Sequence, residues 1–417
     1  MIDLSDEGVG MSVRKRSWTT AKGEKKEAWV ADYVDQAGKR HLKTFDRKKE
    51  ADAFHAKANV EIREGTHTPD SASVTVTEAA NLWLETGRGR RLESSTLDSY
   101  EQHVRLHLVP FIGRLKLSQL TVPMIRELED KLRRGDPAPG AGEGAARSAD
   151  MIKRIVSSLG AMLGDAQERG LVSRNVVRDL RSGRRRSSEK KKDDRQKGKL
   201  KVGIDIPTPN EIKAFIGALQ GQYRPLLLTA TFTGLRASEL RGLRWADLDF
   251  ERRELHVRQR MDKRNVAGPP KSGAGERKIP MPPIVIDTLR EWRLACPKGT
   301  ADLVFPTGNG RPEHHANIAQ RGLIPAWIAA GVTVPGLDKE GKPIEAAKYP
   351  GLHALRHFYA SWLINRKADG GLELPPKLVQ ERLGHSTIAM TLDTYSHLFP
   401  RVDDADELAQ AERVLLG

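Results

Sequence analysis

The segment His353–Leu363 reads HALRHFYASWL, and its spacing decides how the last part of the chain folds. His353, Arg356 and His357 stand at positions i, i+3 and i+4, so their side chains lie on one face of a helix. Apolar residues follow the same period beside them, namely Leu352, Leu355, Tyr359, Trp362 and Leu363. The segment therefore predicts an amphipathic helix that buries one side and presents imidazole and guanidinium groups along the adjoining edge.

Two shorter segments follow this helix, Leu383-Gly384-His385 and Thr394-Tyr395-Ser396-His397. Gly384 has the position of a helix C-cap, and Ser386 or Thr387 is suited to start a new helix. In that helix Ile388, Thr391, Leu392 and Tyr395 share a face, so we expect Tyr395 to point inward, toward His385. Each of these residues taken singly is more often structural; only their combination favours a site.

The composition indicates a polyanionic partner. The chain has 70 Lys and Arg against 55 Asp and Glu, a formal net charge of +15. Cys296 is the only cysteine, which fits a reducing compartment and excludes an internal disulfide. No apolar run reaches the roughly 18 residues of a membrane span, and the N-terminus lacks a signal-peptide pattern, so we expect a soluble intracellular protein with no membrane partner. The sequence leaves open whether Met1 or Met11 is the start.

Residues 12–65 predict a small DNA-binding unit. Ser12 to Trp18, Ala28 to Asp35 and Arg40 to Phe45 are typical of strands, and Asp46 is suited to cap a helix that runs through Ile62. Basic residues crowd the strands and turns, among them Arg14, Lys15, Arg16, Lys39, Arg40 and Lys43. A solvated sheet face is the alternative, but a β-ribbon of this charge density is suited to entering a major groove.

Residues 74–180 predict an all-helical domain. Thr75 and Glu78 have the spacing of a capping box, and Thr121 with Pro123 marks another helix start. A long apolar stripe between Ile152 and Ala166 indicates a helix that Gly170 closes.

Residues 181–204 predict a basic interdomain linker, because apolar periodicity is lost there. The basic residues include Arg184, Arg185, Arg186, Lys190, Lys191 and Lys192. The segment is either a solubilising tether or, as we prefer, a strap along DNA phosphates.

Residues 205–417 predict a mainly α domain with a small antiparallel sheet. Thr208, Pro209 and Glu211 form a strong helix start, and an apolar helix from Pro225 ends at Gly234. Arg236 and Glu239 follow at once. Short strands are predicted at Leu248 to Phe250, Glu254 to Arg260 and Arg277 to Pro280, with Lys271 in the Gly- and Pro-rich connection between the last two. The whole chain is therefore a multidomain α+β protein.

Five motifs stand in order along this last domain: TGLRASEL (233–240), PKS (270–272), HALRH (353–357), LGHS (383–386) and TYSH (394–397). Together they resemble the boxes of the tyrosine recombinase (phage integrase) family. The first two units also resemble the arm-type DNA-binding domain and the helical core-binding domain of integrases, so the resemblance extends over almost the whole chain.

The resemblance implies a catalytic role for Arg236, Lys271, His353, Arg356, His385 and Tyr395, with Glu239 supporting the first arginine. It implies a site-specific recombinase that works in the bacterial host cytoplasm on double-stranded attachment-site DNA. That enzyme would act as a homotetramer, through a 3′-phosphotyrosine and a Holliday junction, without metal, ATP or other cofactor. A directionality factor and a host DNA-bending protein are accessory partners of such integrases.

The residue types suit this chemistry. Two arginines stabilise charge on the nonbridging oxygens, Tyr395 is the nucleophile, His353 is a plausible proton acceptor, and Lys271 is a general acid for the leaving 5′ oxygen. His385 would bind the scissile phosphate. A metal at His314-His315 lacks a third ligand at suitable spacing. Two alternatives stay open: a type IB topoisomerase, and a DNA-binding regulator without catalysis.

Overall fold

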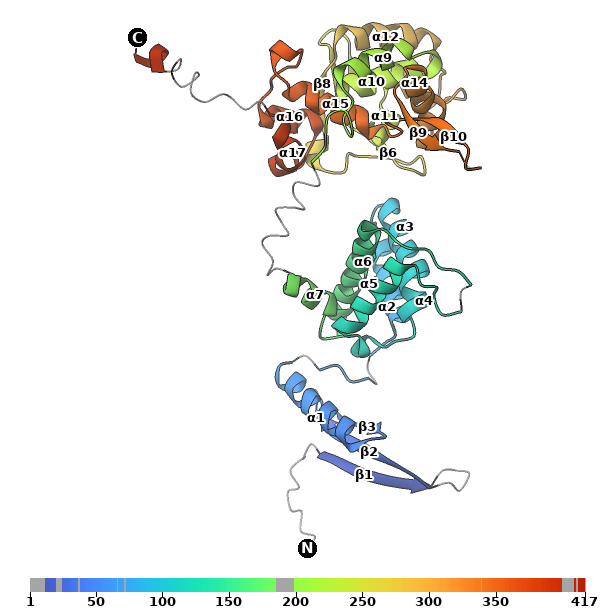
Figure 1. The fold of residues 1–417 in the computed structure, drawn as a ribbon, viewed down its shortest axis with the longest axis vertical. Helices are drawn as coiled ribbons and strands as arrows, with labels where there is room; N and C mark the ends of the chain where they lie inside the picture. The colour runs from blue at the N-terminus through green and yellow to red at the C-terminus, as the bar shows by residue number, and fades with distance from the viewer. Residues whose placement is uncertain are drawn as a thin grey trace. The chain divides into compact units, whose positions relative to one another are not determined.

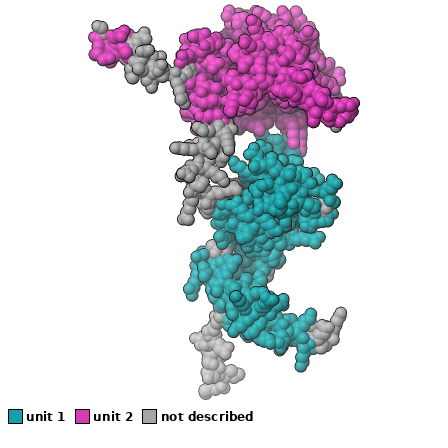
Figure 2. Space-filling model, in the orientation of Figure 1, with its two compact units in different colours: residues 1–188 teal, residues 189–417 magenta. Residues whose placement is uncertain are grey.

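The computed structural model describes residues 12–19, 25–36, 38–65, 67–70, 73–140, 142–184, 199–338, 340–399, 409 and 412–416, with backbone only for residues 181–184. The chain divides into two compact units, residues 1–188 and residues 189–417, which Figure 2 colours separately. Helices and small antiparallel sheets make up both units (Figure 1), so the predicted multidomain α+β class is confirmed.

The first unit begins with a three-stranded antiparallel sheet in the order β1-β2-β3, followed by helix α1. The elements are β1 (Ser12–Thr19), β2 (Lys25–Val34), β3 (Arg40–Phe45) and α1 (Lys48–Arg63). The three predicted strands are confirmed. The predicted cap is wrong, because the N-cap position of α1 is Arg47 and no side chain caps the helix.

The rest of the first unit is helical. Its helices are α2 (Val76–Gly89), α3 (Ser94–His103), α4 (Val109–Ile112), α5 (Val122–Arg134), α6 (Ala149–Glu168) and α7 (Val176–Arg184), with a π-helical turn over Val104–Leu108. Thr75 and Glu78 form the predicted capping box, and Thr121 caps α5. Ile155, Leu159 and Leu163 of α6 lie in the centre of the apolar core. Helix α7 extends into the segment predicted as a linker; Arg185, Arg186 and Lys190–Lys192 lie outside the described residues.

The second unit packs its helices around one core in which the rings of Phe215 and Trp327 stack 4.0 Å apart. Its helices are α9 (Pro209–Ala218), α10 (Arg224–Thr233), α11 (Ala237–Gly242), α12 (Pro283–Ala295), α13 (His315–Asn317), α14 (Ile324–Ala329), α15 (His353–Ile364), α16 (Pro376–Leu383) and α17 (Ile388–Tyr395). The capping box at Thr208 and Glu211 is confirmed. No helix in the described part of the chain is long and apolar enough to cross a bilayer.

Three short sheets border this helical core. Their strands are β4 (Leu248–Asp249), β5 (Glu254–Val257), β6 (Arg260–Met261), β7 (Ala267–Gly268), β8 (Arg277–Pro280), β9 (Thr333–Leu337) and β10 (Pro343–Ala347). Strands β4, β5 and β8 form one antiparallel sheet, whereas β6 pairs with β7 and β9 with β10. The strand predicted from Glu254 to Arg260 is therefore two strands, and the β9–β10 hairpin was not predicted.

The C-terminal ends of α10 and α16 lie beside helix α15 where the sequence motifs are found. Helix α15 packs against α10 and α16. Gly234 ends α10 and Gly384 ends α16, both in the left-handed conformation, with φ of 59° and 64°. A Cβ on Gly234 would lie 2.3 Å from Cδ1 of Tyr359, so only glycine permits this approach of α10 to α15.

Candidate active site

Arg236 lies at the start of α11, where its own helix holds its guanidinium. Glu239, one turn on, accepts from the Arg236 backbone N–H at 2.9 Å and from Arg236 Nη1 at 2.8 Å. The Glu239 side chain is only 3% exposed. Burial would raise the pKa of this carboxyl, but the guanidinium groups of Arg277 and Arg236 hold it below its usual value. Glu239 is therefore a carboxylate, and Arg236 keeps a partly exposed guanidinium beside it.

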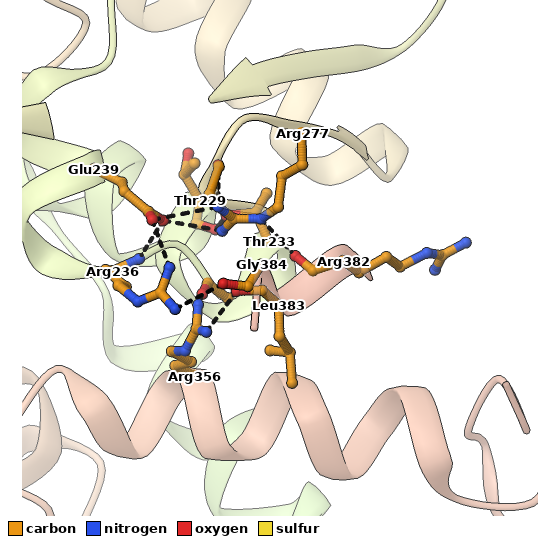
Figure 3. Close-up of polar contacts among 11 residues, drawn as sticks. Thr229, Thr233, Arg236, Glu239, Arg277, Arg356, Arg382, Leu383 and Gly384 are labelled. Carbon is orange, nitrogen blue, oxygen red and sulfur yellow. Dashed lines mark hydrogen bonds and ion pairs between the residues drawn. The ribbon is translucent and has the colours of Figure 1, made fainter. Parts of the chain in front are cut away.

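The turn that follows α16 brings the two motif arginines together (Figure 3). Arg236 Nη2 donates to the Gly384 carbonyl at 3.0 Å, and Arg356 Nη2 donates to the Leu383 carbonyl at 2.6 Å. Arg356 Nη1 also donates to the Gly234 carbonyl at 2.6 Å. Arg356 is buried, and this burial, followed by the neighbouring Arg236, lowers its pKa to about 9. Two positive groups from distant segments thus converge at one point, which suits a doubly charged or developing oxyanion.

Tyr395 is buried and paired with a histidine of α15. Its hydroxyl lies 2.7 Å from His357 Nδ1, and the residue is 2% exposed. Burial raises the pKa of Tyr395 to about 12, although the charge of Arg356 acts in the opposite direction. Burial, then His353 and Arg356, lower the pKa of His357 to about 4. A neutral imidazole therefore faces the phenol at neutral pH and can accept its proton.

His385 contributes a second neutral imidazole beside Tyr395. Their rings are parallel within 3° and their centroids are 6.4 Å apart. His385 Nδ1 lies 2.9 Å from Thr391 Oγ1, and the Gln380 amide donates to the His385 carbonyl at 3.0 Å. Burial, followed by Arg356, lowers the pKa of His385 to about 4. Tyr395 thus points inward toward His385, as the sequence predicted.

The expected partner of Tyr395 differs from the observed one. The sequence suggested His353 as the proton acceptor, whereas the hydrogen bond to Tyr395 is made with His357. His353 is exposed at the first position of α15, with its ring centroid 4.7 Å from that of His357. The i, i+4 spacing put both imidazoles on one face but gave no means of deciding which one reaches the tyrosine.

Lys271 lies on the exposed segment between β7 and β8. Arg277 links that segment to the arginine cluster, which consists of Arg236 and Arg356. It donates to the Gly275 carbonyl at 2.9 Å and to Glu239 Oε2, which also holds Arg236, at 2.9 Å. Sequence reasoning gave Arg277 no role. A signal was present, because alternation in β8 puts Arg277 on the same face as Ile279, which is fully buried.

The predicted DNA-binding residues of the first unit are exposed along the sheet, but several are already paired. Asp32 is buried at 3% exposure and accepts from Arg40 Nε at 2.8 Å and from Arg14 Nη2 at 3.4 Å. The side chains of Arg14 and Arg40 stay 56% and 63% exposed. Lys15 pairs with Glu27 at 2.5 Å and Lys43 with Asp70 at 2.7 Å. Arg16 and Lys39 are exposed as well.

Metal ligation has no candidate group in the described residues: no three His, Cys, Asp or Glu side chains gather closely enough to hold an ion.

Two family descriptions match the chain. Residues 207–401 match the phage integrase family, and residues 75–133 match the phage integrase N-terminal SAM-like domain. The whole of the first match thus lies in the second unit.

Known tyrosine recombinases and integrases are similar to this chain over longer stretches than either family description covers. The chain is 28% identical to a XerC-like tyrosine recombinase of Caldanaerobacter subterraneus over 88% of this chain and 90% of that protein. It is 25% identical to the integrase of Mycobacterium phage D29, over 72% of this chain and 78% of that integrase.

Among solved structures, the fold is similar to that of the Tn1549 transposon integrase bound to transposon right-end DNA. The TM-score is 0.58 at 22% identity, with 82% of this chain and 100% of that one covered. A λ integrase tetramer bound to a Holliday junction gives a TM-score of 0.50 at 18% identity, covering 89% of this chain and 95% of that one. With both family matches, the chain belongs to the phage integrase family of tyrosine recombinases, enzymes that act on DNA.

Proposed function

We propose that this protein is a site-specific DNA recombinase, the integrase of a phage or another mobile element, working in the host cytoplasm. One observation supports this most strongly: the buried Tyr395 hydroxyl lies 2.7 Å from a neutral His357, next to a turn that binds both Arg236 and Arg356. A phenol, a proton acceptor and two guanidinium groups are the parts that attack on a phosphodiester requires.

In the proposed cleavage step, the Tyr395 oxygen attacks the scissile phosphorus and gives its proton to His357. His353, the adjacent exposed imidazole, is the next acceptor toward solvent. The bond between phosphorus and the 5′ oxygen breaks, and Lys271 gives the leaving oxygen a proton. The products are a 3′-phosphotyrosine and a free 5′-hydroxyl.

Charge stabilisation falls to the two arginines and to His385. Arg236 and Arg356 hold the nonbridging oxygens, on which negative charge increases during the attack, and His385 hydrogen-bonds the phosphate. Removal of one such preorganised donor typically costs about 10²–10³ in rate. Glu239 supports Arg236, because its carboxylate binds both the backbone and the guanidinium of that residue.

Resealing reverses these steps on another strand. The 5′-hydroxyl of the partner duplex attacks the phosphotyrosine, Tyr395 leaves and recovers a proton, and the number of phosphodiester bonds is unchanged. The covalent intermediate conserves the bond energy, so the proposed reaction needs neither ATP nor a metal ion. Two successive rounds of exchange pass through a Holliday junction.

The proposed assembly is four protomers on two attachment-site duplexes. The similarity to a λ integrase tetramer bound to a Holliday junction supports this for the present chain. Residues 12–65 would bind arm-type sites, residues 74–180 and 205–417 would enclose the core site, and residues 181–204 would be the basic link between them. A directionality factor and a DNA-bending host protein would complete the assembly.

The test uses Tyr395→Phe on attachment-site DNA, whose sequence is obtained by mapping the junctions that flank the element. We expect the variant to bind this DNA as the native protein does and to form no covalent complex that survives detergent. A DNA-linked band from Tyr395→Phe would show that another residue is the nucleophile.

A further inference from the structure

Arg277, the first residue of β8, is a nearly buried arginine that makes four hydrogen bonds to three parts of the second unit. Nη2 donates to Glu239 Oε2 at 2.9 Å and Nη1 to Glu239 Oε1 at 3.3 Å. Nη1 also donates to the Gly275 carbonyl at 2.9 Å, and Nε to the Arg382 carbonyl at 2.8 Å. The side chain is 6% exposed. A phosphate therefore has little access to it, and its donors are directed at the protein.

Each of these partners belongs to a different part of the proposed active site (Figure 3). Glu239 holds the guanidinium of Arg236. Arg382 immediately precedes the turn whose carbonyls bind Arg356 and Arg236. Gly275 belongs to the segment between β7 and β8, on which Lys271 lies. One side chain thus connects the exposed lysine segment with Glu239 and with the residue just before the turn that binds Arg236 and Arg356.

The packing around Arg277 leaves this connection little freedom. A Cβ on Gly384 would lie 2.8 Å from Arg277 Nη1 and 3.0 Å from the Ala274 carbonyl oxygen. A Cβ on Gly275 would lie 2.5 Å from the Pro270 Cβ, next to Lys271. The turn after α16 therefore packs closely on Arg277 and on Ala274 of the lysine segment, and the lysine segment is itself tightly folded at Gly275. Glycine is required at positions 275 and 384 for this reason.

We propose that Arg277 is a positioning residue, which fixes the segment carrying Lys271 against the Glu239–Arg236 pair so that the lysine reaches the leaving 5′ oxygen. This inference rests on the proposed function, because it gives Lys271 the role of general acid. The guanidinium spreads its donors over three separate nitrogen atoms, Nε, Nη1 and Nη2, each of which binds a different side of the site. A lysine ammonium has its three donors on one nitrogen atom and cannot reach Glu239, Gly275 and Arg382 together.

The experiment compares Arg277→Lys with native protein in single-turnover cleavage of two DNA substrates. One has an ordinary phosphodiester and the other a sulfur atom in place of the bridging 5′ oxygen, whose thiolate leaves without a proton. We expect Arg277→Lys to slow cleavage of the ordinary substrate at least tenfold, because a displaced lysine would lose part of the roughly 10²–10⁴-fold that a general acid contributes. The sulfur substrate should recover most of that loss, as it should for Lys271→Ala.

Two further variants make the result specific. Arg244→Lys is the matched control, because Arg244 also pairs bidentately with a buried carboxylate, Asp247, at 3.0 Å for both bonds, outside the arginine cluster. It should cleave both substrates at native rates. Gly275→Ala changes the segment side of the Arg277–Gly275 hydrogen bond, whereas the bond from Arg277 Nη2 to Glu239 lies on the other side of the guanidinium. It should therefore repeat the sulfur rescue, and it serves as the test of the link between Arg277 and the lysine segment if circular dichroism shows that Arg277→Lys is unfolded.

The two substrates separate the role of Arg277 from that of Lys271. If sulfur rescues Lys271→Ala but neither Arg277→Lys nor Gly275→Ala, or if both variants cleave the ordinary substrate at the native rate, Arg277 does not position the lysine. If sulfur fails to rescue Lys271→Ala itself, the proposed role of Lys271 is wrong, and with it this inference.

Discussion

At the scale of single residues, the protonation states of the site follow from burial. The pKa values of His357 and His385 are both lowered to about 4, chiefly because burial disfavours the charged imidazole. The pKa of Tyr395 is raised to about 12 for the same reason. In the DNA-free protein, therefore, a neutral phenol donates to a neutral imidazole, and neither group is charged before the substrate arrives. The proton of Tyr395 therefore has to pass to His357 during the reaction, and the positive charge of Arg356 favours the phenolate that results.

Replacement of His357 tests the pairing with Tyr395. We expect His357→Ala to lower the single-turnover cleavage rate about 10²–10⁴-fold, the usual contribution of a general base, with DNA affinity unchanged. The comparison is His353→Ala, measured in the same way. A large loss for His353→Ala together with a native rate for His357→Ala would return the acceptor role to His353.

The buried histidines also predict how stability varies with pH. Their pKa values in the folded protein lie below the unfolded value of about 6.5, so the unfolded chain binds more protons between pH ~6.5 and ~4. Their contribution to the free energy of unfolding is therefore complete above pH ~6.5 and is lost as the pH falls toward 4. We expect the urea midpoint to fall between pH 7 and pH 5, and His385→Asn to reduce this fall. An equal fall in His385→Asn would argue against a buried neutral His385.

At the scale of helices and strands, local chemistry predicted the helix ends well. Thr75 and Thr208 cap helices as their spacing indicated, because a cap depends on residues within one turn. Of the two candidates Ser386 and Thr387, Thr387 caps α17. The predicted inward face of α17 is confirmed for Tyr395, which is buried, but not for Ile388 and Leu392, which are 42% and 36% exposed. Periodicity marks a face but not how much of it the neighbouring elements cover.

The sequence pattern could not predict which side chains from distant segments form hydrogen bonds with each other. The His357–Tyr395 hydrogen bond spans 38 residues, and the Arg236–Gly384 bond spans 148. The resemblance named most members of the site, but it gave neither the partner of Tyr395 nor the function of Arg277. Those depend on the packing of α15, α16 and β8, which no single segment encodes.

The end of α10 allows a direct test of this packing. Gly234→Ala should destabilise the protein and slow cleavage, because a left-handed alanine costs about 1–2 kcal/mol and its Cβ would lie 2.3 Å from Tyr359 Cδ1. The Gly234 carbonyl also accepts from Arg356, so the arginine would move with it.

The control is Gly221→Ala, at φ of 64° with no atom within 4 Å of the added Cβ. It should cost the backbone strain alone and leave cleavage unchanged, as measured by urea unfolding and single-turnover assays. Equal losses of stability and activity in the two variants would contradict the tight packing of α10 against α15.

At the scale of the whole molecule, the net charge of +15 fits a protein that neutralises many phosphates. Several basic side chains on the first sheet are paired with Asp32, Glu27 or Asp70, so DNA would have to compete for them. We therefore expect the basic linker of residues 181–204 to contribute strongly to nonspecific affinity.

Salt dependence measures that contribution. Replacing Arg184–Arg186 and Lys190–Lys192 with serine should make the plot of log affinity against log salt shallower by about 0.9 for each phosphate that the variant no longer neutralises. The measurement is a fluorescence anisotropy titration at several salt concentrations, with cleavage of saturating DNA as the control for an intact site. An unchanged slope would mean that the linker is only a tether.

Covalent attachment of DNA to Tyr395 can be detected on the protein itself. The protein is incubated with an attachment-site duplex nicked beside the cleavage position, so that the released fragment diffuses away and the adduct accumulates. Protease digestion and mass spectrometry then locate the modified residue. We expect a nucleotide joined through its 3′ phosphate to Tyr395. An adduct on any other residue, or cleaved DNA with no attached peptide, would contradict this expectation.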